Sequence, residues 1–73
     1  MALEEVLSPV SGTVWKLEKA VGDQVTSNDD ILIVESMKME IGVQSEKDGK
    51  LVELKVAEGD AVDEGDVLAI VEH

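Results

Sequence analysis

Residues 17–35 read LEKAVGDQVTSNDDILIVE, and residues 54–72 read LKVAEGDAVDEGDVLAIVE. The two stretches are 37 positions apart, and the match extends without a gap to residues 4–36 against 41–73, with 12 of 33 pairs identical. Both turn residues, such as the Gly-Asp pairs, and apolar residues recur. A gapless internal repeat of this kind predicts two structurally equivalent halves.

Each half alternates short β-branched runs with turn signals and has no helical period. In the first half the runs cover residues 12–17, 24–26 and 31–35. Asn28 stands opposite Gly65 in the repeat, which suits a turn because both residue types tolerate positive φ. The alternation is imperfect around Val14, Trp15 and Leu17, which predicts either a β-bulge or burial on both faces there and leaves the side that Trp15 faces open.

The repeat also predicts how the halves assemble. Half a sheet of this size cannot bury its own apolar face, so the halves must pack on each other about a pseudo-two-fold axis. We therefore expect an all-β fold, a flattened β-barrel or sandwich (a barrel-sandwich hybrid) of about eight short strands, with residues 1–73 as one domain. The axis places a turn at residues 36–40 at one pole and both chain ends at the other.

Composition excludes several classes of function. The chain has 73 residues, of which 44% are hydrophobic, and its 6 Lys and 17 acidic residues give a formal net charge of −11. This charge repels phosphate backbones and anionic membrane surfaces, so neither nucleic acid nor membrane is an expected partner. There is no cysteine, which excludes disulfides and thiolate chemistry. Because no targeting or membrane-spanning run is visible, the expected location is cytoplasmic.

The predicted turn at residues 36–40 is the part of the chain that stands out chemically. It reads Ser36-Met37-Lys38-Met39-Glu40 and has no counterpart in the second half. A lysine in a turn is most often a solvated tip. Two flanking methionines, if exposed, would make an adaptable contact surface, whereas methionines folded back would only fill gaps in the core. The pattern alone leaves both interpretations open.

The same residues resemble the attachment motif of biotinyl domains, the biotin carboxyl carrier modules of biotin-dependent carboxylases. Residues 8–14 (SPVSGTV), 58–60 (EGD) and 64–68 (EGDVL) also resemble that family, so the resemblance covers essentially the whole chain. The family most often has Ala where this chain has Ser36. Some members carry a thumb inserted in the first half, for which the gapless repeat leaves no space.

The resemblance implies a function for each residue of the turn. Biotin protein ligase would join biotin to Nζ of Lys38, and ligase and carboxylase would recognise its neighbours, which are Glu35, Ser36, Met37, Met39 and Glu40. A biotin carboxylase would then load carboxylate onto the biotin, and a carboxyltransferase would pass it to an acyl-CoA or similar acceptor. The isolated domain would be a monomeric carrier without catalytic activity of its own, either a separate subunit or a fragment of a larger carboxylase.

Two other functions remain possible at this point. A lipoyl domain shares the expected fold and the hairpin lysine, but its tip usually reads Asp-Lys-Ala, so Met-Lys-Met favours biotin. An enzyme is disfavoured because the only histidine, His73, is at the chain end and no nucleotide or zinc-protease motif occurs.

A metal site is a third alternative. Four carboxylates, those of Asp60, Asp63, Glu64 and Asp66, occur within seven residues. Their spacing is not that of an EF-hand loop. Two of these positions are repeated in the first half as Asp23 and Asp29, which favours a role in turns.

Overall fold

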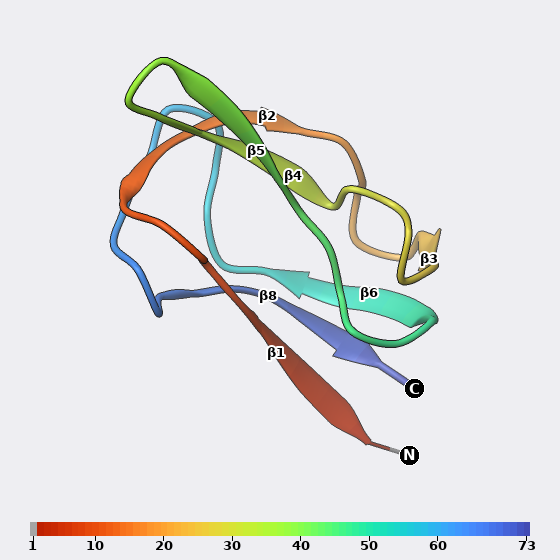
Figure 1. Cartoon of the computed structure of the whole chain (residues 1–73). Coiled ribbons are helices and arrows are strands. Elements are labelled where there is room, and N and C mark those ends of the chain that lie inside the picture. The colour runs from red at the N-terminus through yellow and green to blue at the C-terminus, as the bar shows by residue number, and fades with distance from the viewer. Residues whose placement is uncertain (1) are drawn as a thin grey trace.

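The computed structural model describes residues 2–73, which form eight β-strands and no helix. The strands are β1 (Leu3–Leu7), β2 (Gly12–Leu17), β3 (Gln24–Val25), β4 (Leu32–Ser36), β5 (Met39–Val43), β6 (Gly49–Leu54), β7 (Ala61–Val62) and β8 (Val67–Glu72). They form two antiparallel four-stranded sheets with the orders β1-β8-β6-β3 and β5-β4-β2-β7 (Figure 1). The all-β prediction is confirmed. The described part of the chain has no helix that is long and apolar enough to cross a membrane.

A shift of 37 residues converts one sheet into the other, so the predicted two-fold relation is confirmed. Each sheet takes two strands from each half of the chain. Of the two alternatives predicted near Trp15, the bulge is present, because the pairing of β2 with β4 shifts between Val14 and Lys16. The pairing of β6 with β8 shifts at the equivalent place, between Leu51 and Glu53.

Backbone hydrogen bonds also join the two halves at equivalent places. The Val14 N–H donates to the Asp60 carbonyl (2.8 Å), and the Gly59 N–H donates to the Val14 carbonyl (2.8 Å). At the positions related by the axis, the Leu51 N–H donates to Asp23 (2.9 Å) and Gly22 donates to Leu51 (2.7 Å). Neither half therefore completes its own backbone hydrogen bonding.

The core lies between the two sheets and contains branched aliphatic residues from both halves. Its buried members are Val6, Val14, Val25, Ile31, Leu32, Val34, Val43, Leu51, Val62, Leu68, Ala69 and Val71. Strands β4 and β8, related by the axis, are inner strands of their sheets and supply five of these residues. Because β4 and β8 supply more buried residues than any of the other strands, an element that continues from either of them starts from a rigid base.

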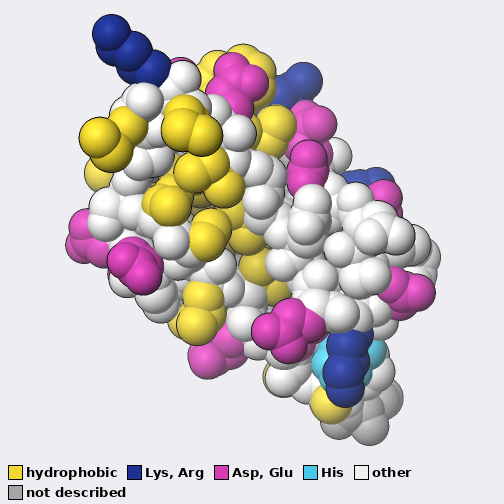
Figure 2. Space-filling model, in the orientation of Figure 1, with side chains coloured by type: hydrophobic (Ala, Val, Ile, Leu, Met, Phe, Trp, Pro, Cys, Tyr) yellow, Lys and Arg dark blue, Asp and Glu magenta, His cyan; other side chains and the backbone are white. Residues whose placement is uncertain are grey.

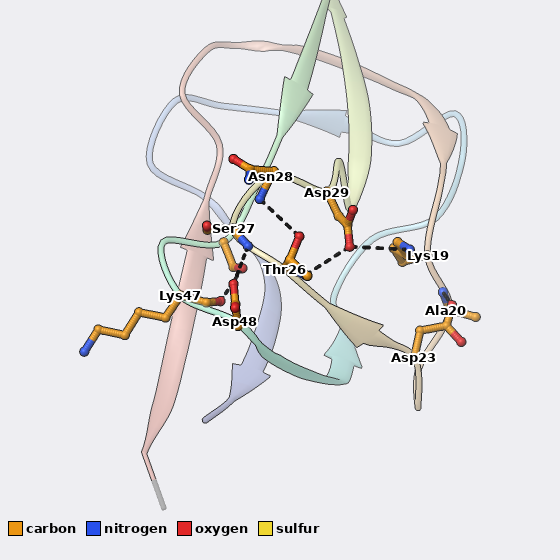
Figure 3. A network of polar contacts seen from close by, with 10 residues as sticks. Lys19, Ala20, Asp23, Thr26, Ser27, Asn28, Asp29, Lys47 and Asp48 are labelled. Carbon is orange, nitrogen blue, oxygen red and sulfur yellow. Dashed lines mark hydrogen bonds and ion pairs between the residues drawn. The ribbon is translucent and has the colours of Figure 1, made fainter.

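Aspartates close the turns, as the repeat predicts. The carboxylates of Asp23, Asp29, Asp60 and Asp66 each accept a hydrogen bond from the backbone N–H three residues earlier, that is from Ala20 (2.9 Å), Thr26 (3.0 Å), Ala57 (2.9 Å) and Asp63 (2.8 Å). Figure 3 shows the Asp29 turn beside Asp48, which accepts from the Ser27 N–H (2.8 Å). Two of the four acids in the candidate metal site, Asp60 and Asp66, therefore accept hydrogen bonds within their own turns.

One expectation about the turns is wrong. Gly22, Gly59 and Gly65 have positive φ (101°, 94° and 90°), but Asn28, the partner of Gly65 in the repeat, does not. The first-half turn closes with the Asp29 N–H donating to the Thr26 carbonyl at 3.0 Å. A type I turn has negative φ at both central residues, so this turn does not require the tolerance that asparagine offers.

The Asp29 turn predicts a pH-dependent contribution to stability. The hydrogen bond from the Thr26 N–H, assisted by Lys19, whose Nζ lies 3.7 Å from the carboxylate, lowers the pKa of Asp29 from its ordinary value. A carboxyl whose pKa is lowered by folding stabilises the protein above its unfolded pKa, and this stabilisation is lost as the pH falls through the folded pKa. We expect Asp29→Asn to lower the urea midpoint at neutral pH and to approach the wild type below about pH 4. Urea unfolding of the wild type and the variant between neutral pH and about pH 3 measures the difference between their midpoints. A difference that stays constant with pH would contradict a lowered pKa at Asp29.

Candidate functional site

The β4–β5 hairpin ends in a turn of only two residues, Met37 and Lys38. Ser36 pairs directly with Met39, and Glu35 pairs with Glu40. Both central residues have positive φ, 52° at Met37 and 66° at Lys38, which is the signature of a type I′ turn. The sequence predicted a turn of five residues, from 36 to 40. The strands run further because the right-handed twist of a hairpin matches a tight type I′ turn.

This turn holds two ordinary residues in a conformation that normally suits Gly or Asn. Within residues 2–73 they are the only non-glycine residues with positive φ. Left-handed backbone costs an L-residue about 1–2 kcal/mol, and such strain persists only where the surrounding structure imposes it. The base of the hairpin provides that support, because Leu32 and Val34 of β4 are fully buried.

Strand β2 approaches β4 closely beside the hairpin. A side chain at Gly12 would collide with the Glu35 carbonyl oxygen, and one at Gly49 would collide with that of Glu72 at the axis-related place. Sequence reasoning did not place Gly12 near the site. Its identity with Gly49 in the repeat was the available signal, and only the sheet register shows that its neighbour is the strand leading into the turn.

The side chains at the turn face solvent, which resolves the alternative that the sequence left open. Met37 is 93% exposed and Met39 is 64% exposed, so neither fills a gap in the core. Lys38 is exposed and has no ion pair or hydrogen bond with any other residue of the described chain. In Figure 2 a lysine side chain stands clear of the surface at the end of the molecule where Figure 1 shows this turn.

The turn lies at the pole opposite the chain ends, as the axis predicts (Figure 1). At the other pole Ala2 and His73 exchange two backbone hydrogen bonds of 2.8 and 2.9 Å. This pair is the counterpart of the pair formed by Met39 and Ser36. The lysine is therefore presented at an end that neither terminus obstructs.

The structure brings all six predicted residues together in the last two pairs of the hairpin and its turn. Since directly paired residues share a face, Glu35 and Glu40 lie together on the outward face of the sheet, and Ser36 and Met39 lie on the opposite face. Like charges in direct cross-strand pairs are destabilising. The two carboxylates therefore add no stability to the tip that they flank.

The tip presents an amine that no other side chain of the described chain contacts. Residues 2–73 contain no cluster of three His, Asp or Glu side chains able to hold a metal ion. An amine becomes nucleophilic only after it loses a proton, and a general base within hydrogen-bond reach would be needed to take it. What the tip offers is an exposed primary amine at a defined position between two exposed thioethers.

Comparison with known proteins identifies the family. Residues 4–71 match the model of the family described as biotin-requiring enzyme. The chain is 44% identical over 59 residues to the biotin/lipoyl attachment protein of Bacillus subtilis, covering 81% of each chain. It is also 42% identical over 69 residues to urea amidolyase of Lachancea kluyveri, covering 94% of this chain and 4% of that protein. The crystal structure of Kluyveromyces lactis urea carboxylase superposes with a TM-score of 0.93 and 36% identity over 99% of this chain and 6% of that one.

The chain therefore belongs to the biotinyl-domain family, with covalently attached biotin as its cofactor and a biotin carrier role. The lipoyl alternative is correspondingly disfavoured. The chain spans only a small part of the length of relatives such as urea amidolyase. Its unpartnered, exposed lysine amine fits a cofactor that is joined through an amide bond.

The strained turn predicts an unusual gain of stability. Met37→Gly removes the Cβ at a positive-φ position and should raise the free energy of unfolding by about 0.5–1 kcal/mol. Met39→Gly serves as the control, because the same change in a strand residue should lower the free energy of unfolding by about 1 kcal/mol. Urea unfolding measures both. Equal losses in the two variants would show that the turn is not strained.

Proposed function

We propose that Lys38 is the residue that carries biotin and that the domain shuttles carboxylate between two partner active sites. A biotin protein ligase would form the amide between Nζ of Lys38 and the biotin carboxyl group. A biotin carboxylase would then load the ring, and a carboxyltransferase would unload it. The observation that carries the proposal is the exposed Met-Lys-Met apex, held on a rigid two-residue turn at the free pole of the molecule.

The geometry suits presentation to another protein. A turn anchored by buried strand residues keeps the lysine Cα in one place, so little backbone entropy is lost on docking. The Met37 and Met39 side chains are flexible and polarisable, and they can adapt to more than one partner surface. This is the property that a carrier visiting a ligase, a carboxylase and a carboxyltransferase requires.

No side chain of the described chain contacts the Lys38 amine, so the partner enzymes supply the reacting groups. The ligase must supply the base that removes the proton from the lysine and the activated biotinyl group that the amine attacks. Amide formation removes one positive charge, which takes the formal charge from −11 to −12. The arm that results is neutral and flexible, so it enters an active site at a lower desolvation cost than an ammonium. All later bond making then belongs to the partner enzymes.

The names of the relatives support a carboxylase as the destination. They include a biotin-dependent acyl-coenzyme A carboxylase subunit of Mycobacterium leprae and a pyruvate carboxylase of Staphylococcus aureus. These proteins act on different acceptors. We therefore assign this chain the carrier step that they share, with the acceptor set by its partner carboxyltransferase.

Replacement of the lysine tests the attachment site. Lys38→Arg keeps a positive charge at the turn but removes the primary amine, so the variant should fold and accept no biotin from a ligase supplied with biotin and ATP. Lys47→Arg, at another exposed lysine, should accept one biotin as the wild type does. Intact and peptide mass spectrometry provide the readout, and the added mass also separates biotin from lipoate. Biotin on the Lys38→Arg chain would refute the assignment.

The methionines predict an effect on recognition without an effect on folding. Met37→Leu and Met39→Leu keep apolar area but lose the thioether and its flexibility, so kcat/KM for ligase or carboxylase should fall between about twofold and tenfold. The free energy of unfolding should stay within about 0.5 kcal/mol of the wild-type value because both side chains are exposed. An unchanged kcat/KM with both partners would show that Met37 and Met39 take no part in recognition.

A further inference from the structure

The sulfur of this chain is concentrated at the lysine turn. The chain has three methionines and no cysteine, and Met37 and Met39 are the only sulfur-containing residues within residues 2–73. They flank Lys38 on both sides, and their exposed fractions are 93% and 64%. Methionine is oxidised to its sulfoxide when an oxidant reaches the sulfur, so exposure favours the reaction. Within the described chain, the turn is therefore the place where a mild oxidant meets a thioether.

Oxidation at the turn would leave the core unchanged. The buried residues between the two sheets are Val, Leu, Ile and Ala, and no methionine is among them. A sulfoxide formed inside a core places a polar oxygen among apolar groups and disrupts their packing. Here both sulfurs belong to exposed side chains, so the buried residues of β4 and β5 keep their contacts. The chemical change is confined to the surface that presents Lys38.

The two sulfurs differ in their surroundings. Met37 belongs to the turn itself, with a backbone φ of 52°, and its side chain is almost fully exposed. Met39 is a strand residue that pairs with Ser36. It lies two positions before Ile41 and shares its face of β5, which continues into the core because Ile41 pairs with the buried Val34. Since Met39 is the more covered of the two, we expect Met37 to be oxidised first.

The charge around the turn favours one class of oxidant. Glu35 and Glu40 form the direct cross-strand pair next to the one that closes the turn, and the whole chain has a formal net charge of −11. A field of this sign repels anionic oxidants but does not hinder a neutral one. Hydrogen peroxide is a very weak acid and is therefore neutral at physiological pH. Peroxide is accordingly the oxidant that suits this surface.

We propose that Met37 and Met39 form a reversible oxidation site that controls the access of partner enzymes to Lys38. The thioether sulfur attacks one oxygen of hydrogen peroxide, an S–O bond forms as the O–O bond breaks, and the leaving hydroxide takes the proton of the transferred oxygen to become water. The sulfur is oxidised and the peroxide is reduced. A methionine sulfoxide reductase reverses the change with a dithiol, which becomes a disulfide while the oxygen leaves as water.

Oxidation changes what the turn offers to a partner. A thioether is apolar and flexible, whereas a sulfoxide is polar and chiral and its oxygen accepts hydrogen bonds. A partner surface that fits two thioethers would have to desolvate two S=O groups, so docking weakens although the Lys38 amine itself is unchanged. This inference rests on the proposed function, in which the methionines contact the ligase. The carrier would stay unloaded under peroxide and regain loading after reduction.

The test uses the full chain before biotinylation, so that the thioether of biotin does not compete for the oxidant. After treatment with hydrogen peroxide, trypsin cleaves behind Lys38 and separates the two methionines, and peptide mass spectrometry should show the Met37 sulfoxide before the Met39 sulfoxide. With both sulfoxides present, kcat/KM for biotinylation by the ligase should fall about tenfold. The urea midpoint should not change. Reductases for both sulfoxide epimers, supplied with a dithiol, should restore kcat/KM.

The double variant Met37→Leu with Met39→Leu is the matched control. It keeps Met1 and Trp15, which peroxide can also modify, and peroxide should leave its own, lower kcat/KM unchanged. An unchanged kcat/KM in the doubly oxidised wild type, or an equal loss in the double variant, would overturn the oxidation site alone. A wild type that accepts no biotin before any peroxide is added would refute both the attachment at Lys38 and this inference.

Discussion

Each half of this chain buries its apolar strands only by packing against the other half. Every sheet takes two strands from each half, and backbone hydrogen bonds between Val14 and the Gly59–Asp60 turn tie the halves together. A single half would expose its apolar face and leave backbone groups unpaired. Because both halves contribute to both sheets, folding is expected to be all-or-none, and nearly all stabilising contacts join residues far apart in sequence.

The site uses the rigidity that this arrangement creates. Strand β4 lies between β5 and β2, and its buried residues hold a turn in which Met37 and Lys38 adopt left-handed backbone. A lone hairpin would relax that strain, so the core that fixes the fold also fixes the position of the lysine. At the axis-related pole Ala2 pairs with His73. The Met-Lys-Met turn is therefore found at one pole of the symmetric scaffold.

Much of the fold was predictable from the sequence, because turn and core residues of the first half recur at matching positions in the second half. The bounds of β2 followed from a β-branched run, the turns at Asp23 and Asp60 followed from the recurring Gly-Asp pairs, and the bulge at Trp15 was one of two interpretations of the broken alternation. The Met-Lys turn was the exception. It has no partner in the repeat, and neither residue carries a local preference for positive φ, so its length was overestimated.

The sequence by itself determined the fold class, the two-fold organisation and the residue types at the tip, since each of these follows from local pattern and repetition. Only the tertiary structure decided that Met37 and Met39 point to solvent, and that Gly12 meets the strand leading to the turn. It also decided that Trp15, at the bulge of β2, is 48% exposed. Exposure and face depend on strand register and on how far the hairpin extends beyond the opposite sheet, which are non-local quantities.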